Sequence, residues 1–389
     1  MSEEVLFKIQ KKDLETGLRG IPVGYCVTSK VDSQKGLYYV NYPISQLANW
    51  EPERVIYLLL HGVDPNTTCL IDFKNALIQR GHCPEKVLHA ITQIPCEGDP
   101  MALFSTAILI LGMHIATGNY REDCLNLIAK LPHLTAALIN YHAGWGKTPP
   151  SKPELGYMEN FTQMILAPQK SKTLHRVLKI FNILHYDHGG GNLSTFVGKA
   201  VASGLENMYG SIAAAMNALA GPRHGRANQE CLHFVKTMVE EVGEEGTVEE
   251  VEGIIRKKLA SKELIYGFGH AVLRIEDPRA TVQYELADSL FHDHVLIRMA
   301  FLIRYAGTKV LKENPKIASP YPNVDAISGP LLTAAGFPYS DYYTILFGLS
   351  RAVGIAIQIV YEREEAREGK GTPIIRPKYL FKRRKDNDS

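Results

Sequence analysis

The amino-acid sequence predicts a mainly α-helical fold. Over most of the chain apolar residues recur three or four positions apart, which is the spacing of a helix with one buried face. Segments that have the composition of strands are few and local. Hydrophobic residues make up 45% and charged residues 22% of the 389 positions, a balance typical of a soluble globular protein, and this length predicts two or three domains.

The first elements expected along the chain are a strand pair and an apolar helix. Residues 24–30 and 37–42 have strand composition, with a turn around Asp32 to Gly36 between them. Residues 101–116 are strongly apolar and follow Asp99-Pro100, which is typical of a helix start. A membrane span needs about 20 residues, so we expect a buried core helix here and no membrane partner.

The remaining expected elements are helices. An amphipathic helix ends at the glycine run 189–191, so His185 and His188 are expected in its last turn. The Ala-rich segment 209–220 should form a helix that approaches its neighbour closely, at a helix crossing or a subunit interface. Further helices are predicted at 121–140, 228–242, 248–262, 282–287, 295–312, 326–335 and 341–368.

Charge and cysteine spacing exclude several classes of protein. The formal net charge of +2 argues against a nucleic-acid partner, and the basic run 382–385 is expected to be a solvated tail. The six cysteines include no Cys-x-x-Cys pair, which fits neither a zinc cluster nor a disulfide framework. The N-terminal segment lacks an apolar signal core and is acidic at Glu3 and Glu4. We therefore expect a cytoplasmic protein.

Three short motifs each place one reactive side chain beside glycine or proline. They are GPRHGRANQE with His224, GFGHAVLRIEDPR with His270 and PNVDAISG with Asp325. Glycine and proline predict helix ends or tight turns, where a side chain can point into a cleft. If the three meet in space, an aspartate base and two imidazole donors could enolise a carbonyl compound and add it to a keto acid.

Three arginines lie in motifs of their own in the same half of the chain. They are Arg279 in DPRAT, Arg351 in FGLSRAVG and Arg376 in IIRPKYL. A guanidinium group can bind a carboxylate through two parallel hydrogen bonds. If these groups converge near the two histidines, the site would bind a small acid with several negative charges.

Purely structural roles for the same residues remain open from the sequence. Asp325 could simply cap the helix that follows it. Arg279 could form a surface ion pair, and Arg351 could pair with Glu362 or Glu364.

Two other site types are weakly indicated. Gly267-Phe268-Gly269 has the spacing of part of a dinucleotide loop, but no strand, turn and helix surround it. His185 and His188 could be metal ligands, but no third or fourth ligand accompanies them, so we expect no metal.

The motifs resemble those of the citrate synthase family, and the resemblance covers nearly the whole chain. It begins at GLRGIPVGYCVTSK, continues through ENFTQMIL and LHYDHGGGNLSTFVGKAVAS, and reaches the RPK near the C-terminus. The strongest stretches are YGSIAAAMNALAGPRHGRANQE, YGFGHAVLRIEDPR and YPNVDAISG. The resemblance implies a two-domain helical fold in which a small domain, 226–336, is inserted in a large domain made of 1–225 and 337–389. The turn at His224 would be the hinge.

The resemblance also implies an acyltransferase that joins acetyl-CoA to oxaloacetate. His224 would donate a hydrogen bond to the thioester carbonyl, Asp325 would remove a methyl proton, and His270 would protonate the ketone as the enol attacks it. Citryl-CoA would then be hydrolysed in the same site to citrate and CoA. No permanently bound cofactor is implied, because acetyl-CoA is a co-substrate.

Further residues receive roles from the same resemblance. Ser194 would orient His224. In a homodimer, oxaloacetate would be held by His188, Arg279, Arg351 and Arg376, with Arg376 supplied across the interface. Two basic residues would contact the phosphates of CoA, namely Arg274 and Lys316.

The chain departs from the family pattern at several positions. Gly189 stands where the family commonly has glutamate, Val40 and Asn41 replace an Arg-Gly pair, and Ala318 replaces a lysine. Two alternatives follow. A 2-methylcitrate synthase that uses propionyl-CoA would share the site motifs, and a binding protein could retain the keto acid while CoA chemistry is impaired.

Overall fold

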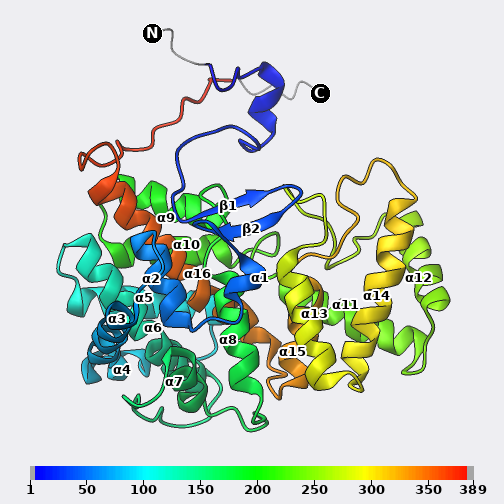
Figure 1. Cartoon of the computed structure of the whole chain (residues 1–389), viewed down its shortest axis with the longest axis horizontal. Helices are drawn as coiled ribbons and strands as arrows, with labels where there is room; N and C mark the ends of the chain where they lie inside the picture. Colours follow the sequence, from blue (N-terminus) through cyan, green and yellow to red (C-terminus); the bar gives the residue numbers. More distant parts are fainter. Residues whose placement is uncertain (1–4, 383–389) are drawn as a thin grey trace, which may run out of the picture.

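The fold is described from a computed structural model that covers residues 5–382. Glu3, Glu4 and positions 383–385 of the basic run lie outside the described residues. Within 5–382 the chain forms sixteen α-helices and one small antiparallel sheet, so the prediction of a mainly α fold is confirmed (Figure 1).

The sheet comes first in the chain and has three short strands, β1 (Ser29–Asp32), β2 (Gly36–Tyr39) and β3 (Tyr42–Pro43). Ser29 pairs with Tyr39 and Asp32 with Gly36, which places the predicted turn between β1 and β2. The first strand begins later than predicted, because residues before Ser29 turn toward the helices, where the Thr28 hydroxyl donates to Asp187.

The helices follow in sequence order. In the first half they are α1 (Ile44–Leu47), α2 (Pro52–His61), α3 (Thr67–Arg80), α4 (Glu85–Ile91), α5 (Pro100–Ile115), α6 (Tyr120–His142), α7 (Tyr157–Met164), α8 (Leu174–His185) and α9 (Leu193–Ser203). In the second half they are α10 (Met208–Leu219), α11 (Ala227–Val242), α12 (Val248–Ala260), α13 (Pro278–Phe291), α14 (Val295–Lys312), α15 (Asp325–Ala334) and α16 (Tyr343–Val360).

The predicted helices occur, but several ends differ. α13 starts four residues earlier than predicted, because the Asp277 side chain caps it and Pro278 occupies its first position. α8 ends at His185, so His188 lies beyond the helix and not in its last turn. α16 ends at Val360 and continues as one π-helical turn to Glu365 instead of reaching residue 368.

Two groups of helices lie side by side. α2 to α10 and α16 form one group, which we call the large lobe, and α11 to α15 form the other, the small lobe, at the right of Figure 1. The sheet lies where the lobes meet: the Tyr39 hydroxyl donates to Ile183 O at 2.8 Å, and Arg274 N donates to Ser33 O at 2.8 Å. The exact domain boundaries at 226 and 336 remain a prediction.

The core of the large lobe is built around α16, which is buried along its whole length. The helical stretch Ser340–Glu365 is long and apolar enough to cross a membrane, but its most apolar window is completely buried inside the fold, as in the core helix of a soluble protein. α10 packs on α9 and α5, as expected for a helix rich in small residues. A Cβ added at Gly198 of α9 would lie 3.1 Å from the Cβ of Ala215, so this crossing is close.

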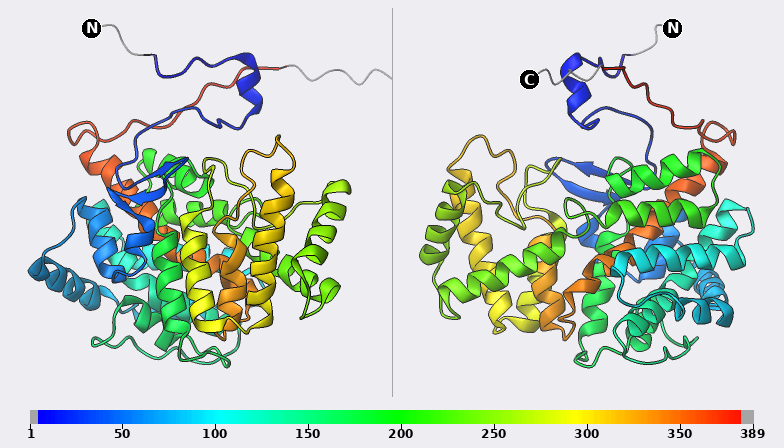
Figure 2. Two further views of the ribbon diagram at one scale, coloured as in Figure 1. Left: turned by 45° about the vertical axis from the view of Figure 1, so that its right-hand side comes forward. Right: turned by 180° about the vertical axis from the view of Figure 1, so that it is seen from behind.

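The two ends of the described chain run together away from the helical body. Figure 2 shows the N-terminal segment and the C-terminal segment 371–382 on the same side of the molecule, beyond the sheet. Hydrogen bonds near its start tie the C-terminal segment to the body, from Thr372 N to Glu362 O at 2.9 Å and from Ile375 N to Ser203 Oγ at 2.9 Å.

Candidate active site

His188 lies just beyond the end of α8, between the two lobes. Its Nε2 is buried and has no hydrogen-bond partner within residues 5–382. Burial lowers the pKa of His188 well below its ordinary value, and the positive charges of Arg279 and Arg351 lower it further. The ring is therefore neutral, and the unpartnered nitrogen is available to a ligand.

His270 belongs to the loop between α12 and α13. Its Nδ1 accepts hydrogen bonds from the backbone N–H groups of Val272 at 3.0 Å and Leu273 at 2.9 Å. Because Nδ1 is an acceptor, the ring proton lies on Nε2. Burial, followed by the charge of Arg279, lowers the pKa of His270 to about 4. The ring centroids of His270 and His188 are 5.1 Å apart, so the two neutral imidazoles are neighbours.

The loop that carries His270 is paired with the segment that precedes Asp325. Phe268 and Pro322 form an isolated antiparallel bridge, and Asn323 N donates to Gly267 O at 2.9 Å. The glycines around Phe268 therefore shape this bridge, and they do not form a phosphate loop at the start of a helix. The dinucleotide interpretation is not supported.

Asp325 is the first residue of α15. Asn323 Oδ1 accepts from Asp325 N at 3.0 Å, so Asn323 caps this helix end, and the proposed capping role of Asp325 is wrong. The Asp325 carboxylate makes no hydrogen bond to any described residue. Burial raises the pKa of Asp325 to about 6, although the charge of Arg279 opposes the shift. A carboxylate held in this way is ionised at neutral pH and is a stronger base than an exposed one.

His224 lies in the turn between α10 and α11, next to the start of α9. Its Nε2 is 2.9 Å from the Ser194 hydroxyl, and the backbone N–H of Ser194 points to the same nitrogen at 3.3 Å. Since a backbone N–H can only donate, Nε2 is an acceptor and the ring proton lies on Nδ1. Burial, followed by the charge of Arg351, lowers the pKa of His224 to about 4, so this imidazole is also neutral.

Arg279 forms a buried ion pair at the start of α13. Its guanidinium donates to both carboxylate oxygens of Asp277, from Nε at 3.1 Å and from the terminal nitrogen at 2.7 Å. The two side chains are 4% and 1% exposed, so the ion pair considered from the sequence exists but is not on the surface. Burial works to lower the pKa of Arg279, but Asp277 raises it overall. Asp277 therefore offsets the positive charge that a ligand would meet at Arg279.

Arg351 has no such partner. It is 2% exposed, its Nε donates to the His185 carbonyl at 3.0 Å, and it forms no ion pair with any described carboxylate. Burial lowers the pKa of Arg351 to about 10, so it stays positively charged at neutral pH. The predicted alternatives are wrong, because Glu362 pairs with Lys199 and Glu364 with Arg121. A buried guanidinium without a counter-ion indicates a site for an anion.

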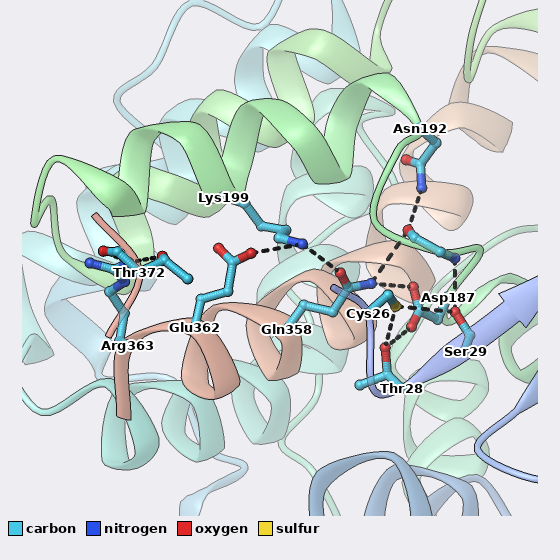
Figure 3. A network of polar contacts seen from close by, with 11 residues as sticks. Cys26, Thr28, Ser29, Asp187, Asn192, Lys199, Gln358, Glu362, Arg363 and Thr372 are labelled. Carbon is cyan, nitrogen blue, oxygen red and sulfur yellow. Dashed lines mark hydrogen bonds and ion pairs between the residues drawn. The ribbon is translucent and has the colours of Figure 1, made fainter. Parts of the chain in front are cut away.

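A network of buried polar groups surrounds Asp187, the residue before His188, and Figure 3 shows Asp187 together with Thr28, Gln358 and Lys199. The Asp187 carboxylate accepts from His188 N at 2.8 Å, from Gln358 Nε2 at 2.8 Å and from the Thr28 hydroxyl. Lys199 continues the network from Gln358 Oε1, and its amine lies 2.9 Å from the Glu362 carboxylate. The backbone of His188 is thus fixed by residues from three parts of the chain: Thr28, just before β1, Lys199 of α9 and Gln358 of α16.

Comparison with known proteins now decides the family. Residues 17–378 match the family model described as citrate synthase, C-terminal domain. The chain belongs to the citrate synthase family. Citrate synthases are acyltransferases, and this chain is therefore an enzyme of that class.

Curated citrate synthases from plants and fungi are similar over most of their length. Citrate synthase 4, mitochondrial, of Arabidopsis thaliana is 35% identical over 89% of this chain and 78% of the relative. The peroxisomal citrate synthase of Saccharomyces cerevisiae is 33% identical over 93% and 82%, respectively. The mitochondrial 2-methylcitrate synthase of Yarrowia lipolytica is also 33% identical, over 93% and 82%.

Solved citrate synthases have the same fold. The enzyme from the archaeon Thermoplasma acidophilum, in a ternary complex with carboxymethyl coenzyme A and oxaloacetate, aligns with a TM-score of 0.83 at 25% identity, covering 96% of this chain and 97% of that one. Citrate synthase from Thermotoga maritima aligns with a TM-score of 0.80 at 26% identity, with the same coverage. The two-domain helical fold implied by the sequence motifs is thus the fold of this family.

Three residues expected at a citrate synthase site do not join the central cluster. Arg274 is exposed and its guanidinium donates to the carbonyls of its own loop, including Leu273 O at 2.8 Å. Lys316 is exposed on the loop after α14. Arg376 is exposed on the segment 371–382 that leaves the helical body.

The departure at Gly189 has a structural reason. Gly189 has a φ of +74°, in the left-handed region that side-chain-bearing residues rarely adopt. No other group lies within 4 Å of a Cβ added there. The position is therefore restricted by its backbone conformation and not by space, and a glutamate would be strained.

Sequence reasoning missed three residues that shape the site. Asp277 neutralises Arg279, and Asp187 and Gln358 hold the backbone of His188. Asp277 belongs to the same DPR motif as Arg279, so the pairing of these two residues could have been predicted from the sequence. Asp187 and Gln358 are 171 positions apart, and nothing local in the sequence pairs them.

Within the described residues, no group of three or more His, Cys, Asp or Glu side chains is arranged to hold a metal ion. His185, one of the two suggested ligands, instead bonds the carbonyl of Phe181 in its own helix through Nδ1 at 2.7 Å.

Proposed function

We propose that the chain condenses acetyl-CoA with oxaloacetate and water to give citrate and CoA. The observations that carry this proposal are that Asp325 lies within reach of the charges of Arg279 and Arg351, and that His224 and His270 are both neutral, with ring protons on Nδ1 and Nε2 respectively. An enol condensation with a keto acid requires a base, two uncharged hydrogen-bond donors and a positively charged site that binds the carboxylates of the keto acid.

Oxaloacetate would bind between the lobes. The unpaired guanidinium of Arg351 offers donors to one carboxylate, and the unpartnered Nε2 of His188 offers a further hydrogen bond. Arg279 would contribute less charge than an isolated arginine, because Asp277 already occupies two of its donors.

The proton transfers follow from the assigned ring protons. Asp325 would take a proton from the methyl group of acetyl-CoA, while the Nδ1–H of His224 holds the enol oxygen. As the enol carbon bonds to the ketone carbon of oxaloacetate, the Nε2–H of His270 would deliver a proton to the ketone oxygen. Hydrolysis of citryl-CoA by water then releases citrate and CoA.

The decisive experiment measures thiol release with oxaloacetate and either acetyl-CoA or propionyl-CoA. Faster release from acetyl-CoA supports the proposal. Faster release from propionyl-CoA would favour the second candidate, a 2-methylcitrate synthase, for which the similarity to the Yarrowia lipolytica enzyme is the supporting observation. Tight oxaloacetate binding without release from either thioester would instead indicate a binding protein with impaired CoA chemistry.

We also propose that the active form is a homodimer in which Arg376 completes the oxaloacetate site of the partner subunit, and that Arg274 and Lys316 contact the CoA phosphates. The exposure of Arg376 on a segment that leaves the body supports this arrangement. Arg376→Ala should weaken oxaloacetate binding and Asp325→Asn should have very low turnover, and mixing the two variants should restore part of the activity. No recovery in mixtures that form dimers would overturn the shared site.

The proposed location is the cytoplasm, which the six free cysteines support because disulfides are rare there. Similar citrate synthases carry mitochondrial and peroxisomal names. Cell fractionation is the test, and recovery of the protein inside either organelle would contradict this location.

A further inference from the structure

Two adjoining cavities lie in the large lobe, apart from the candidate active site. The cavity that also reaches α6, which we call the inner cavity, has a volume of about 240 Å³, and the other, which we call the outer cavity, has a volume of about 530 Å³. Both are lined by residues of α2, α3 and α7 and by the loop before α7, and they share Glu53, Lys74, Ile78, Pro153, Leu155 and Tyr157. None of the residues assigned to the condensation lines either cavity.

Glu53 gives these cavities a buried acceptor. Its side chain is only 6% exposed, and its Oε1 accepts from Tyr157 N at 2.7 Å. Its second oxygen has no protein donor within residues 5–382, and Lys74, the cation that also lines both cavities, is bonded to Glu51 at 2.8 Å. The N-terminal end of α2 offsets part of the charge, but a buried carboxylate with one hydrogen bond is unusual.

His133 gives the inner cavity a buried donor. The residue is 1% exposed, and its Nδ1 accepts from Cys83 N at 3.2 Å. The ring proton therefore lies on Nε2, which has no acceptor among the described residues. Burial, followed by the neighbouring His82, lowers the pKa of His133 to about 4, so the ring is neutral and Nε2–H is a permanent donor at physiological pH.

Most of the remaining inner wall is apolar, and Ser151, Lys152 and Asn160 are its other polar residues. Leu77, Ala129, Pro132 and Met164 contribute to it. Its volume is below the roughly 300–1,000 Å³ of sites for drug-sized ligands, so it would hold about one ring. An apolar pocket with few fixed polar groups is the usual form of a small-molecule site.

We propose that this inner cavity binds a small flat molecule that presents a nitrogen hydrogen-bond donor to Glu53, such as an amidine or a primary amide. An amide would also offer an oxygen to His133, whereas an anion would be repelled by Glu53. This site is separate from the condensation centre, and its occupation does not depend on the proposed function.

Three probes of the same shape test the proposal: benzamidine, benzamide and benzoate. Benzamidine presents nitrogen donors and a positive charge. Benzamide presents one amide donor group and one oxygen acceptor without a charge, and benzoate presents two oxygen acceptors and a negative charge. Calorimetric titration of the full chain should show binding of benzamidine and benzamide, and benzoate should bind at least roughly tenfold more weakly, as expected for two carboxylates in a buried site.

Substitution at Glu53 separates the charge from the shape of the cavity. Glu53→Gln keeps an oxygen for Tyr157 N but removes the charge, so benzamidine should lose roughly tenfold or more in affinity and benzoate should no longer be disfavoured. Unchanged selectivity in this variant would overturn the role of Glu53.

Blocking the cavity is an independent test. Ile78 lines both cavities, is 38% exposed and lies on α3, so Ile78→Trp should abolish binding of all three probes without a buried defect. Ile71, on the same helix and 53% exposed, lines neither cavity, and Ile71→Trp is the matched control that should bind normally. Absence of probe binding to the unmodified chain, or equal binding by the two variants, would overturn the proposal and leave the condensation activity untouched.

Discussion

The two lobes hold their parts of the candidate active site in different ways. In the large lobe, two of the groups are held by residues that are distant in the sequence: His224 by Ser194, and Arg351 by the carbonyl of His185. In the small lobe the holding groups are local, since His270 is fixed by backbone N–H groups two and three positions later. Arg279 is likewise fixed by an aspartate two positions earlier.

This difference indicates how the site could tolerate movement. The His270 loop, its bridge to the segment before Asp325 and the Arg279 pair form one locally bonded unit, which can shift as a whole without losing its internal geometry. The large-lobe groups depend on the packing of α8, α9 and α16. A movement of the small lobe toward a fixed large lobe would preserve both the local hydrogen bonds of the small lobe and the helix packing of the large lobe.

The pKa of Asp325 is influenced by charged residues of both lobes, namely Arg279 and Arg351. Its substitution should have the largest effect on activity. Asp325→Asn removes the proposed base and should lower kcat by on the order of 10² to 10⁴, with a smaller change in oxaloacetate affinity. Folded Asp325 holds its proton up to a pH of about 6, against 3.8 in the unfolded chain, so its ionisation costs stability as the pH rises through this window. Thermal unfolding at pH 7 should therefore show an equally or more stable variant, and a destabilised one would mean that lost activity reflects misfolding.

Arg351 tests the large-lobe side of the comparison. Arg351→Gln removes the unpaired charge and should raise KM for oxaloacetate roughly 10- to 100-fold, the range for a lost hydrogen bond to a charged group. The KM for acetyl-CoA should change much less. Steady-state kinetics with each substrate varied in turn gives both values, and equal rises in the two would contradict a role confined to the keto acid.

The pH dependence tests whether one group or several control the reaction. Asp325 has a pKa of about 6, whereas His224 and His270 have pKa values of about 4 and stay neutral over the same range. The value of kcat/KM should therefore fall about tenfold per pH unit below 6, with a single ionisation. A steeper decline between pH 5 and 6 would show that an imidazole also titrates there.

Ser194 should have the smallest effect of the four. Ser194→Ala removes the hydroxyl beside His224 Nε2 but keeps the backbone N–H that also points to it, so kcat should fall only about fivefold. Ser194→Thr, which keeps a hydroxyl, should recover most of the rate. Loss of activity as large as that of Asp325→Asn would mean that the backbone contact does not hold the ring.

The reactive residues could be predicted from the sequence because each lies in a short motif with turn-forming neighbours. The electrostatic state of the site could not. Arg279 and Arg351 have the same side chain and similar burial, but one is paired by Asp277 and the other is unpaired. Whether a buried charge finds a partner depends on which helices pack together, and the contact between Gln358 and Asp187 joins segments that no local pattern relates.

Secondary structure shows the same limit. Helices with a clear apolar face, such as α14, were predicted with the observed ends. α1, α2, α3, α4, α7 and α9 were not predicted, because several of them are short and owe their stability to packing in the large lobe. The strand signal before Ser29 was misleading, since that segment is held by side-chain contacts with Asp187.

Three side chains of the buried helix α16 support the candidate active site: Arg351 bonds the carbonyl of His185, Gln358 bonds Asp187, and the Phe347 ring lies 4.8 Å from the Arg351 guanidinium. Phe347, Arg351 and Gln358 are four and seven positions apart, so they project from one side of a helix with 3.6 residues per turn. Gly354 lies between Arg351 and Gln358, and a Cβ added there would be 2.9 Å from the Cβ of Asp187. α16 and the segment just after α8 therefore pack closely at a position that has no side chain. Inserting or deleting one residue would rotate one end of this row of side chains by about 100° against the other. Relatives of this chain should therefore differ in α16 by substitutions and not by insertions or deletions.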